Sequence, residues 1–225
     1  MNKKIILFAL ILIGANKQMH SQEQLNSTDS NGEKHGAWKV YFDEQPKQLK
    51  FEGEFHHGRK IGLFKYYQKG LKHPVATMEF KPNTDTVQVK YLSQAGKIIS
   101  EGQMLNEKRI GTWQYYHNGS DKIMMIEHYE KGQLQGEKLT YYDTGKLAEK
   151  AEYFEGELQG KKLLYSEKGV ILEDLTYEHG ELHGPAKFYN GKGELLSEGK
   201  YKRDQHSGTW SYFENGKLKE RKNYN

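Results

Sequence analysis

Aromatic and aliphatic residues recur along this chain at a nearly constant spacing. A second ladder of such residues runs in phase with the first over eight periods. A fixed period of roughly 24–26 residues is typical of repeat proteins, in which each unit buries its apolar groups against its neighbours. The pattern therefore predicts one repeat domain over residues 32–225. The first ladder is Tyr41, Tyr67, Tyr91, Tyr116, Tyr141, Tyr165, Tyr189 and Phe213, and the second is Phe55, Phe80, Met104, Tyr129, Tyr153, Tyr177, Tyr201 and Tyr224.

Each repeat has the pattern of a β-hairpin. In the last one, an aromatic strand over 210–213 precedes Asn215-Gly216, a pair that tolerates the positive φ angles of a type I′ turn, and a returning strand follows. Glycine pairs such as Gly156 and Gly160 indicate the connections between hairpins. We expect an all-β fold, an elongated array of about eight antiparallel hairpins in one extended twisted sheet. Further hairpin turns are predicted at Asn118-Gly119, Thr144-Gly145, Lys168-Gly169 and Lys192-Gly193.

Alternation along the strands assigns side chains to the two faces of this sheet. Trp113 and Tyr115 share one face, and Gln114 and Tyr116 share the other. The ladder from Tyr41 to Phe213 falls on the Tyr116 face and is predicted to be the structural spine. The Trp113 face changes character along the array, because Lys138, Lys162 and Ala186 replace its aromatic residues in repeats five to seven.

The aromatic residues of the Trp113 face form the candidate binding surface. Such rings suit a protein interface or a stacking surface for sugars, and they equally suit a core, so the pattern leaves both interpretations open. The candidate residues are Trp38, Phe64, Trp113, Tyr115, Trp210 and Tyr212.

The N-terminus differs from the rest of the chain. Residues 1–4 are basic, 5–15 form an apolar run, and a polar stretch follows, which predicts a secretory signal peptide over residues 1–22. An uncleaved membrane anchor is the alternative. Residues 23–31 are expected to form a flexible polar leader. The predicted location is outside the cytoplasm: periplasmic, associated with the outer membrane, or extracellular in a bacterium.

Charge and composition narrow the classes of partner. The chain has 34 basic and 30 acidic residues, a net charge of +4. Removal of the predicted signal would take Lys3, Lys4 and Lys17 with it, leaving 31 against 30, or +1. This balance argues against nucleic acid as a partner, which calls for a clustered basic excess. The absence of cysteine rules out disulfides, thiolate zinc sites and a cysteine nucleophile.

Searches for catalytic and metal-binding patterns give no candidate residues. There is no G-x-S-x-G motif, and acidic pairs such as Glu52 and Glu54 recur with the hairpins. His179 and His183 have a spacing that gathers metal ligands only on a helix, whereas Gly180 and Gly184 predict a turn here. We therefore expect no catalytic site, no metal and no cofactor.

The repeat resembles the variant form of the MORN repeat (membrane occupation and recognition nexus). The resemblance is carried by G-T-W-Q-Y-Y at Gly111, S-E-G-K-Y at Ser197, N-G-K-L at Asn215 and the recurring G-x-x-x-G, and it covers nearly all of the mature chain. It implies stacked hairpins, no intrinsic enzyme activity, and contact with proteins or lipids. Bacterial members are often assigned as antitoxins of toxin–antitoxin systems.

Three hypotheses about function follow. The first is a non-enzymatic exported scaffold that binds another protein along its sheet. The second is recognition of envelope glycan or lipid headgroups, with aromatic rings stacking on sugars and Lys138 and Lys162 meeting anions. The third, implied by the resemblance alone, is an antitoxin or immunity role. The sequence leaves the oligomeric state open.

Overall fold

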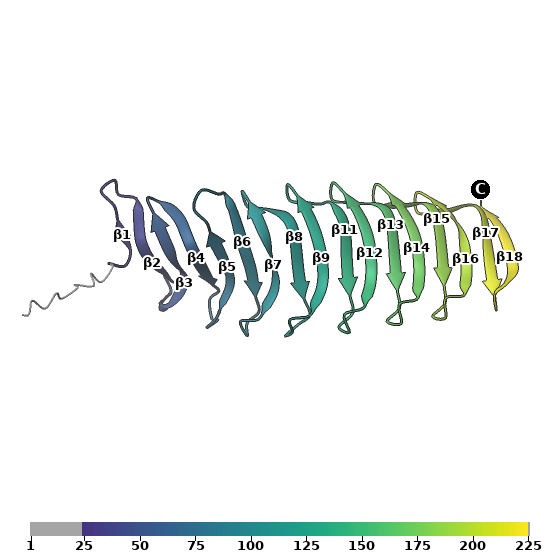
Figure 1. The fold of residues 1–225 in the computed structure, drawn as a ribbon, viewed down its shortest axis with the longest axis horizontal. Coiled ribbons are helices and arrows are strands. Elements are labelled where there is room, and N and C mark those ends of the chain that lie inside the picture. The colour runs from purple at the N-terminus through teal and green to yellow at the C-terminus, as the bar shows by residue number, and fades with distance from the viewer. Residues whose placement is uncertain (1–23, 225) are drawn as a thin grey trace, which may run out of the picture.

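A computed structural model describes residues 24–224 of the chain. These residues form a single open sheet of 18 strands, which confirms the predicted all-β hairpin array (Figure 1). The predicted signal peptide lies outside the described residues. The strands are β1 (Ser27–Thr28), β2 (Lys34–Phe42), β3 (Gln45–His56), β4 (Arg59–Tyr67), β5 (Pro74–Phe80), β6 (Thr86–Leu92), β7 (Ile98–Leu105), β8 (Lys108–Tyr116), β9 (Ile123–Glu130), β10 (Gln133–Leu134), β11 (Gly136–Tyr141), β12 (Leu147–Phe154), β13 (Glu157–Tyr165), β14 (Ile171–Glu178), β15 (Glu181–Tyr189), β16 (Leu195–Lys202), β17 (Gln205–Glu214) and β18 (Lys217–Tyr224).

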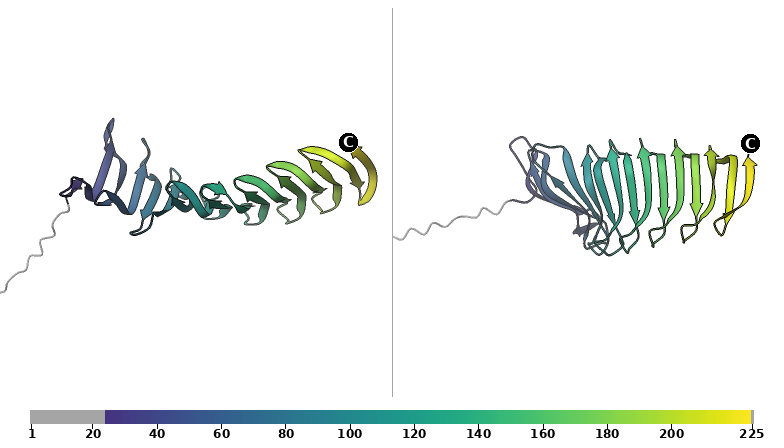
Figure 2. Two further views of the ribbon diagram at one scale, coloured as in Figure 1. Left: turned by 90° about the horizontal axis from the view of Figure 1, so that it is seen from above. Right: turned by 45° about the vertical axis from the view of Figure 1, so that its right-hand side comes forward.

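From β1 to β9 and from β11 to β18, each strand pairs antiparallel with the next one in the chain; β10 and β11 lie end to end and both pair with β9. The strands therefore follow one another along the long axis in chain order, from β1 at one end to β18 at the other (Figure 1). A view from above and an oblique view show that the strands are curved and that the array twists along its length (Figure 2). No helix among the described residues is long and apolar enough to cross a membrane.

Two kinds of tight turn alternate along the array. Between β17 and β18, Asn215 and Gly216 have φ angles of 52° and 71°, as a type I′ turn requires. The same two-residue geometry occurs at several predicted connections between hairpins, for example Glu155-Gly156 between β12 and β13. Other hairpin turns close differently: Gly193 alone has positive φ, and its N–H bonds the Asn190 carbonyl. Short connections of one to six residues thus join each strand to the next.

The buried core lies on one face of the sheet, which we call the core face; the opposite side is the second face. Across the described residues, the fully buried hydrophobic side chains all belong to the face that carries Trp113. The predicted spine on the second face is therefore wrong, since Tyr41 is 42% exposed and the rest of that ladder is at most half-buried. The buried set is Phe55, Phe64, Ala76, Val89, Trp113, Ala151, Leu175, Ala186 and Trp210.

Tyr91 lies on the core face, although the first ladder was expected to run along the second face. It pairs with Ser100, which in turn pairs with Tyr115, and its ring centroid lies 6.1 Å from that of Trp113. Leu92, one residue later, takes the position that Tyr116 has in the next repeat. A slip of one residue moves a side chain to the opposite face of a strand, so the aromatic spacing alone placed Tyr91 wrongly.

Glycine on a neighbouring strand makes room for the largest core side chains. A Cβ atom at Gly102 would lie 2.4 Å from the ring of Trp113, and one at Gly199 would lie 2.3 Å from that of Trp210. Gly53 stands in the same relation to Phe64. An aromatic ring thus lies flat across a glycine in repeats two, four and eight, which explains the glycine of the E-G-x-F, E-G-x-M and E-G-x-Y motifs at the ends of three returning strands.

The expected flexible leader is partly ordered. Residues 27–28 form β1, which pairs with β2, and the Asn26 side chain both donates to and accepts from the backbone of Lys39. The indole Nε1 of Trp38 donates to the carbonyl of Ser27 at 3.1 Å. Residues 24–31 therefore cover the N-terminal edge of the sheet. Their polar composition gave no alternating pattern from which this strand could be predicted.

Candidate functional site: a polar segment of the core face

Three of the six predicted surface residues are buried. Phe64 and Trp113 have no exposed area, and Trp210 is 1% exposed. Their rings cover glycines and pack against neighbouring aromatic residues, for example Phe64 against Phe55 at a centroid distance of 5.2 Å. The expectation that these rings lie on an accessible surface is thus corrected: they belong to the core.

The other three predicted residues are half-buried and far apart along the array. Trp38 lies on β2 at one end, Tyr115 on β8 in the middle, and Tyr212 on β17 at the other end. The Tyr212 hydroxyl lies 3.0 Å from that of Tyr224. The structure therefore does not bring the six residues together as one patch, and Tyr115 is the member that borders an unusual part of the face.

In the middle of the array, charged side chains occupy positions that hold core residues elsewhere. We call this group the mid-array polar segment, and it spans β8 to β13. Lys138 and Lys162 occupy the position of Trp113, and Glu127 stands where Gly102 and Gly199 stand in other repeats. Its members are Arg109, Glu127, Lys138, Glu149 and Lys162.

Arg109 starts the segment by lying on Trp113. Its guanidinium carbon is 4.4 Å from the centre of the indole ring, and its Nη1 donates to the hydroxyls of Tyr115 at 2.7 Å and Tyr129 at 3.0 Å. Tyr129 in turn donates to Glu127 Oε2 at 2.7 Å. A guanidinium over an aromatic face combines cation–π attraction with fixed donor directions, so this part of the segment is well ordered.

The two lysines extend the network over the next strands. Lys138 Nζ lies 4.0 Å from Glu127 Oε1, and Lys162 Nζ lies 3.2 Å from Glu149 Oε2. Glu127 is buried, with 6% of its area exposed, whereas the lysine side chains are 23% and 27% exposed. The carboxylate of Glu127 is therefore held inside the face, and the ammonium groups remain accessible from solvent.

Burial shifts the pKa values of ionisable side chains in and around the segment. Desolvation, followed by hydrogen bonding with Tyr129 and Glu127, raises the pKa of Tyr115 well above its usual value. Desolvation also raises the pKa of Tyr153 and of Tyr177, the core-face tyrosines on β12 and β14. Burial lowers the pKa of Lys162, but the hydrogen bond and charge attraction of Glu149, together with the charge of Glu173 and the nearby Tyr177, outweigh this and leave the pKa raised. At neutral pH the segment thus presents cations beside neutral phenols.

The second face carries ion pairs instead of a core. Lys65 pairs with Glu52 at 3.3 Å, and Lys90 with Glu101 at 3.1 Å. Desolvation together with a hydrogen bond to Glu52 raises the pKa of Tyr67 to about 12. Exposed pairs of this kind contribute little stability, so the second face is a solvated surface with tyrosines anchored to carboxylates.

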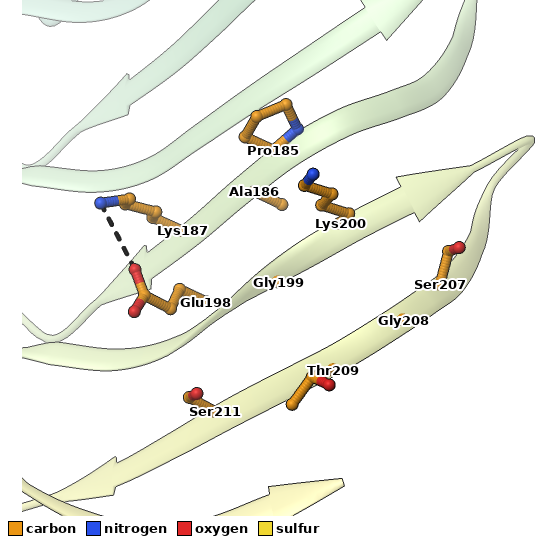
Figure 3. Close-up of a pocket in the computed structure, with 10 residues that line it drawn as sticks. All are labelled: Pro185, Ala186, Lys187, Glu198, Gly199, Lys200, Ser207, Gly208, Thr209 and Ser211. Carbon is orange, nitrogen blue, oxygen red and sulfur yellow. Dashed lines mark ion pairs between the residues drawn. The ribbon is translucent and has the colours of Figure 1, made fainter. Parts of the chain in front are cut away.

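A shallow depression on the second face has the backbone of Gly199 in its lining and the pair Lys187–Glu198, 3.4 Å apart, at its side (Figure 3). The side of the depression away from this ion pair is formed by β17, through Ser207, Thr209 and Ser211. It lies behind Trp210 and is open to solvent. Nothing in it groups a nucleophile with a base, so it offers no catalytic arrangement.

The repeat pattern points to Lys138 and Lys162 but not to Arg109 and Glu127. The signal for Glu127 was present, because M-I-E-H-Y at Met125 aligns with S-E-G-K-Y at Ser197 and puts glutamate where glycine is expected. Arg109 lies in the turn-proximal part of β8, which the motif does not constrain. Its contact with Trp113 depends on the three-dimensional packing.

Comparison with known proteins identifies the repeat. The family model described as the MORN repeat variant matches residues 134–155, 182–203 and 208–225, each match covering one hairpin of the array. This confirms the resemblance predicted from the motifs. MORN repeats are non-catalytic motifs that generally bind proteins or membranes. A comparison with curated proteins finds no significant match.

Proposed function

Because this chain carries MORN-variant repeats, we propose that it is a non-enzymatic exported scaffold that binds another protein across the mid-array polar segment. Binding would take place on the core face between β8 and β13, where Tyr115 and the two lysines are partly accessible. The proposal keeps the first hypothesis from the sequence and moves its surface from the buried aromatic rings to the polar segment.

The observation that supports this proposal is the replacement of core residues by charges. Other repeats fill the same pair of positions with glycine and an aromatic ring, or with Leu175 and Ala186. Burying the carboxylate of Glu127 beside Lys138 carries a desolvation cost, and a well-packed apolar pair is often as stable or more stable. Because an apolar pair would stabilise the sheet at least as well, a role in recognition accounts for the charged residues Glu127 and Lys138 at these positions.

Site-specific photocrosslinking tests the proposal. The photoreactive residue benzoylphenylalanine is placed at Thr140, which lies on the core face and pairs with Glu149 and Met125. The matched control position is Leu139, the adjacent residue on the second face, which pairs with Lys150. Illumination of cells should give discrete protein adducts from position 140 and far weaker ones from position 139. Equal patterns from both positions would remove this face as the binding surface.

Recognition of envelope glycan or lipid headgroups is the alternative. The lysines of the segment could meet anionic headgroups, and MORN repeats as a class also bind membranes. Sedimentation of the purified chain with vesicles containing anionic lipid, and with peptidoglycan, separates this alternative from protein binding. Strong co-sedimentation at low salt without protein adducts would favour it. An antitoxin or immunity role stays a prediction from the resemblance.

A further inference from the structure

Three histidines converge at the N-terminal end of the array. His35 lies on β2, His56 ends β3, and His57 follows in the turn to β4 with a φ angle of 47°. The ring centroids are 4.4 Å apart for His56 and His57, 5.1 Å for His35 and His57, and 5.2 Å for His35 and His56. One ring nitrogen from each residue lies within 4.8 Å of the other two. The register of β2 and β3 thus gathers three imidazoles from distant sequence positions.

A carboxylate orients one of these rings. Asp29, in the loop between β1 and β2, accepts the backbone N–H groups of Asn31 and Glu33 through Oδ1, and its Oδ2 lies 2.6 Å from His57 Nδ1. A carboxylate that accepts the Nδ1–H of a histidine leaves the lone pair of Nε2 free to bind a metal ion, which is the usual outer-shell arrangement of metal-bound histidine.

His35 supplies a second, independent observation. Within residues 24–224, its Nδ1 is the one buried side-chain nitrogen or oxygen without a hydrogen-bond partner. Buried polar atoms are normally satisfied, and an exception calls for an unplaced partner. Either a water molecule or a metal ion beside the three rings would satisfy this atom, and the grouping of three imidazoles favours the metal.

We propose that His35, His56 and His57 form a binding site for a divalent transition metal such as zinc, with Asp29 as the positioning residue for His57. Tetrahedral zinc has Zn–N bonds of about 2.0–2.1 Å, which puts donor atoms about 3.4 Å apart. The ring nitrogens already lie within 4.8 Å of one another, and side-chain rotation would bring them to this spacing. Water, or the nearby carboxylate of Glu33, would complete the coordination.

This proposal departs from the sequence-based expectation of no metal. That expectation rested on His179 and His183, which the structure separates: the His179 side chain is 82% exposed and faces Glu157 at 3.8 Å, while His183 lies 3.7 Å from Glu178. His57 and His179 occupy equivalent turn positions, yet only the N-terminal one has two further imidazoles beside it. The repeat pattern does not reveal this cluster, because it forms only where the pairing of β2 with β3 brings His35 and His56 next to His57.

Zinc titration of the untagged purified chain, followed by competition with a chromophoric chelator, tests the site. We expect about one equivalent bound with a Kd of about 1 µM or tighter. H35N and H57N should each weaken binding about 100-fold, and D29N about 10-fold to 100-fold, because the outer-shell carboxylate orients a ligand. H179N and H183N serve as matched controls at exposed histidines and should bind zinc as the unmodified chain does.

Cobalt substitution gives a readout that does not depend on affinity alone. Co²⁺ in the chain should show the visible absorption of a tetrahedral site with nitrogen donors, and H35N should lose it while its circular dichroism spectrum stays unchanged. The proposal is overturned if zinc binds without stoichiometry, if H179N weakens binding as much as H57N, or if E33Q abolishes binding while H35N leaves it intact.

Discussion

At the scale of single residues, the fold depends on what stands beside each core position. Trp113 is fully buried in an open one-layer sheet because Gly102 lets its ring lie flat, Arg109 covers it, and Tyr91 and Tyr129 contact its edges. Its indole Nε1 also donates to the Gln103 carbonyl at 3.0 Å. Stability in such a thin structure therefore rests on a few closely packed pairs.

Substituting Gly102 by alanine should destabilise the protein by about 1–3 kcal/mol, because its methyl group would overlap the ring of Trp113. Urea unfolding measures the change. Gly191, which has open space around its Cβ position and no positive φ, gives the control: G191A should change stability by less than about 0.5 kcal/mol. In a W113A background, G102A should lose most of its cost. An equal cost in both backgrounds would show that the ring is not responsible.

The second prediction concerns pH. The Tyr116 hydroxyl donates to Glu101 Oε1 at 2.5 Å, and this bond is the largest cause lowering the pKa of Glu101 below its usual 4.5. A lowered carboxyl pKa stabilises the folded state above pH 4.5, and this contribution disappears as the pH falls through the folded-state pKa. Y116F should therefore cost about 1 kcal/mol at pH 7 and clearly less at pH 3, as measured by urea unfolding.

Y142F is the control for that experiment. The Tyr142 hydroxyl donates to the backbone carbonyl of Tyr165 at 2.6 Å, so its loss should cost a similar amount at both pH values. If Y116F and Y142F showed the same dependence on pH, the bond to Glu101 would not be the source of the effect.

At the scale of strands and turns, the sequence predicted the hairpins well and the covered face poorly. Turn residues such as Asn215-Gly216 and the spacing of the ladders define local geometry, which the chain encodes directly. The alternation of side chains separates the two faces of the sheet. It does not tell which face is buried, because aromatic residues occur on both. The glycines at 53, 102 and 199 held the missing information, because a glycine beside a ring marks the face on which that ring is packed.

The terminal strand β18 covers the last tryptophan. Seven of its eight residues are exposed, yet Lys222 pairs with Trp210, and Tyr224 packs against that cluster. Truncation after Gly216 should expose Trp210 and shift tryptophan emission to longer wavelength, while the other hairpins keep their β-sheet circular dichroism because each contacts only its neighbours. The shift should be absent from the same truncation made with W210F. Unfolding of the whole array would contradict this independence of the hairpins.

At the scale of the whole molecule, the core face is aromatic in some stretches of the array and charged in another. Aromatic rings on glycines pack the N-terminal half up to Trp113 and the last repeat at Trp210, and the mid-array polar segment lies between these two tryptophans on the same face. The opposite face carries ion pairs along its length. One continuous face thus serves the fold at the ends and, in the proposed function, recognition in the middle.

The measurement that tests this division most directly is photocrosslinking from position 140 in a chain carrying E127L and K138A. These substitutions copy the pair formed by Leu175 of β14 and Ala186 of β15, so the free energy of unfolding should stay within about 1.5 kcal/mol of the original or rise. The account predicts a stable protein whose protein adducts are lost, whereas K161A on the second face leaves them intact. Adducts that persist undiminished in the E127L/K138A chain would contradict it.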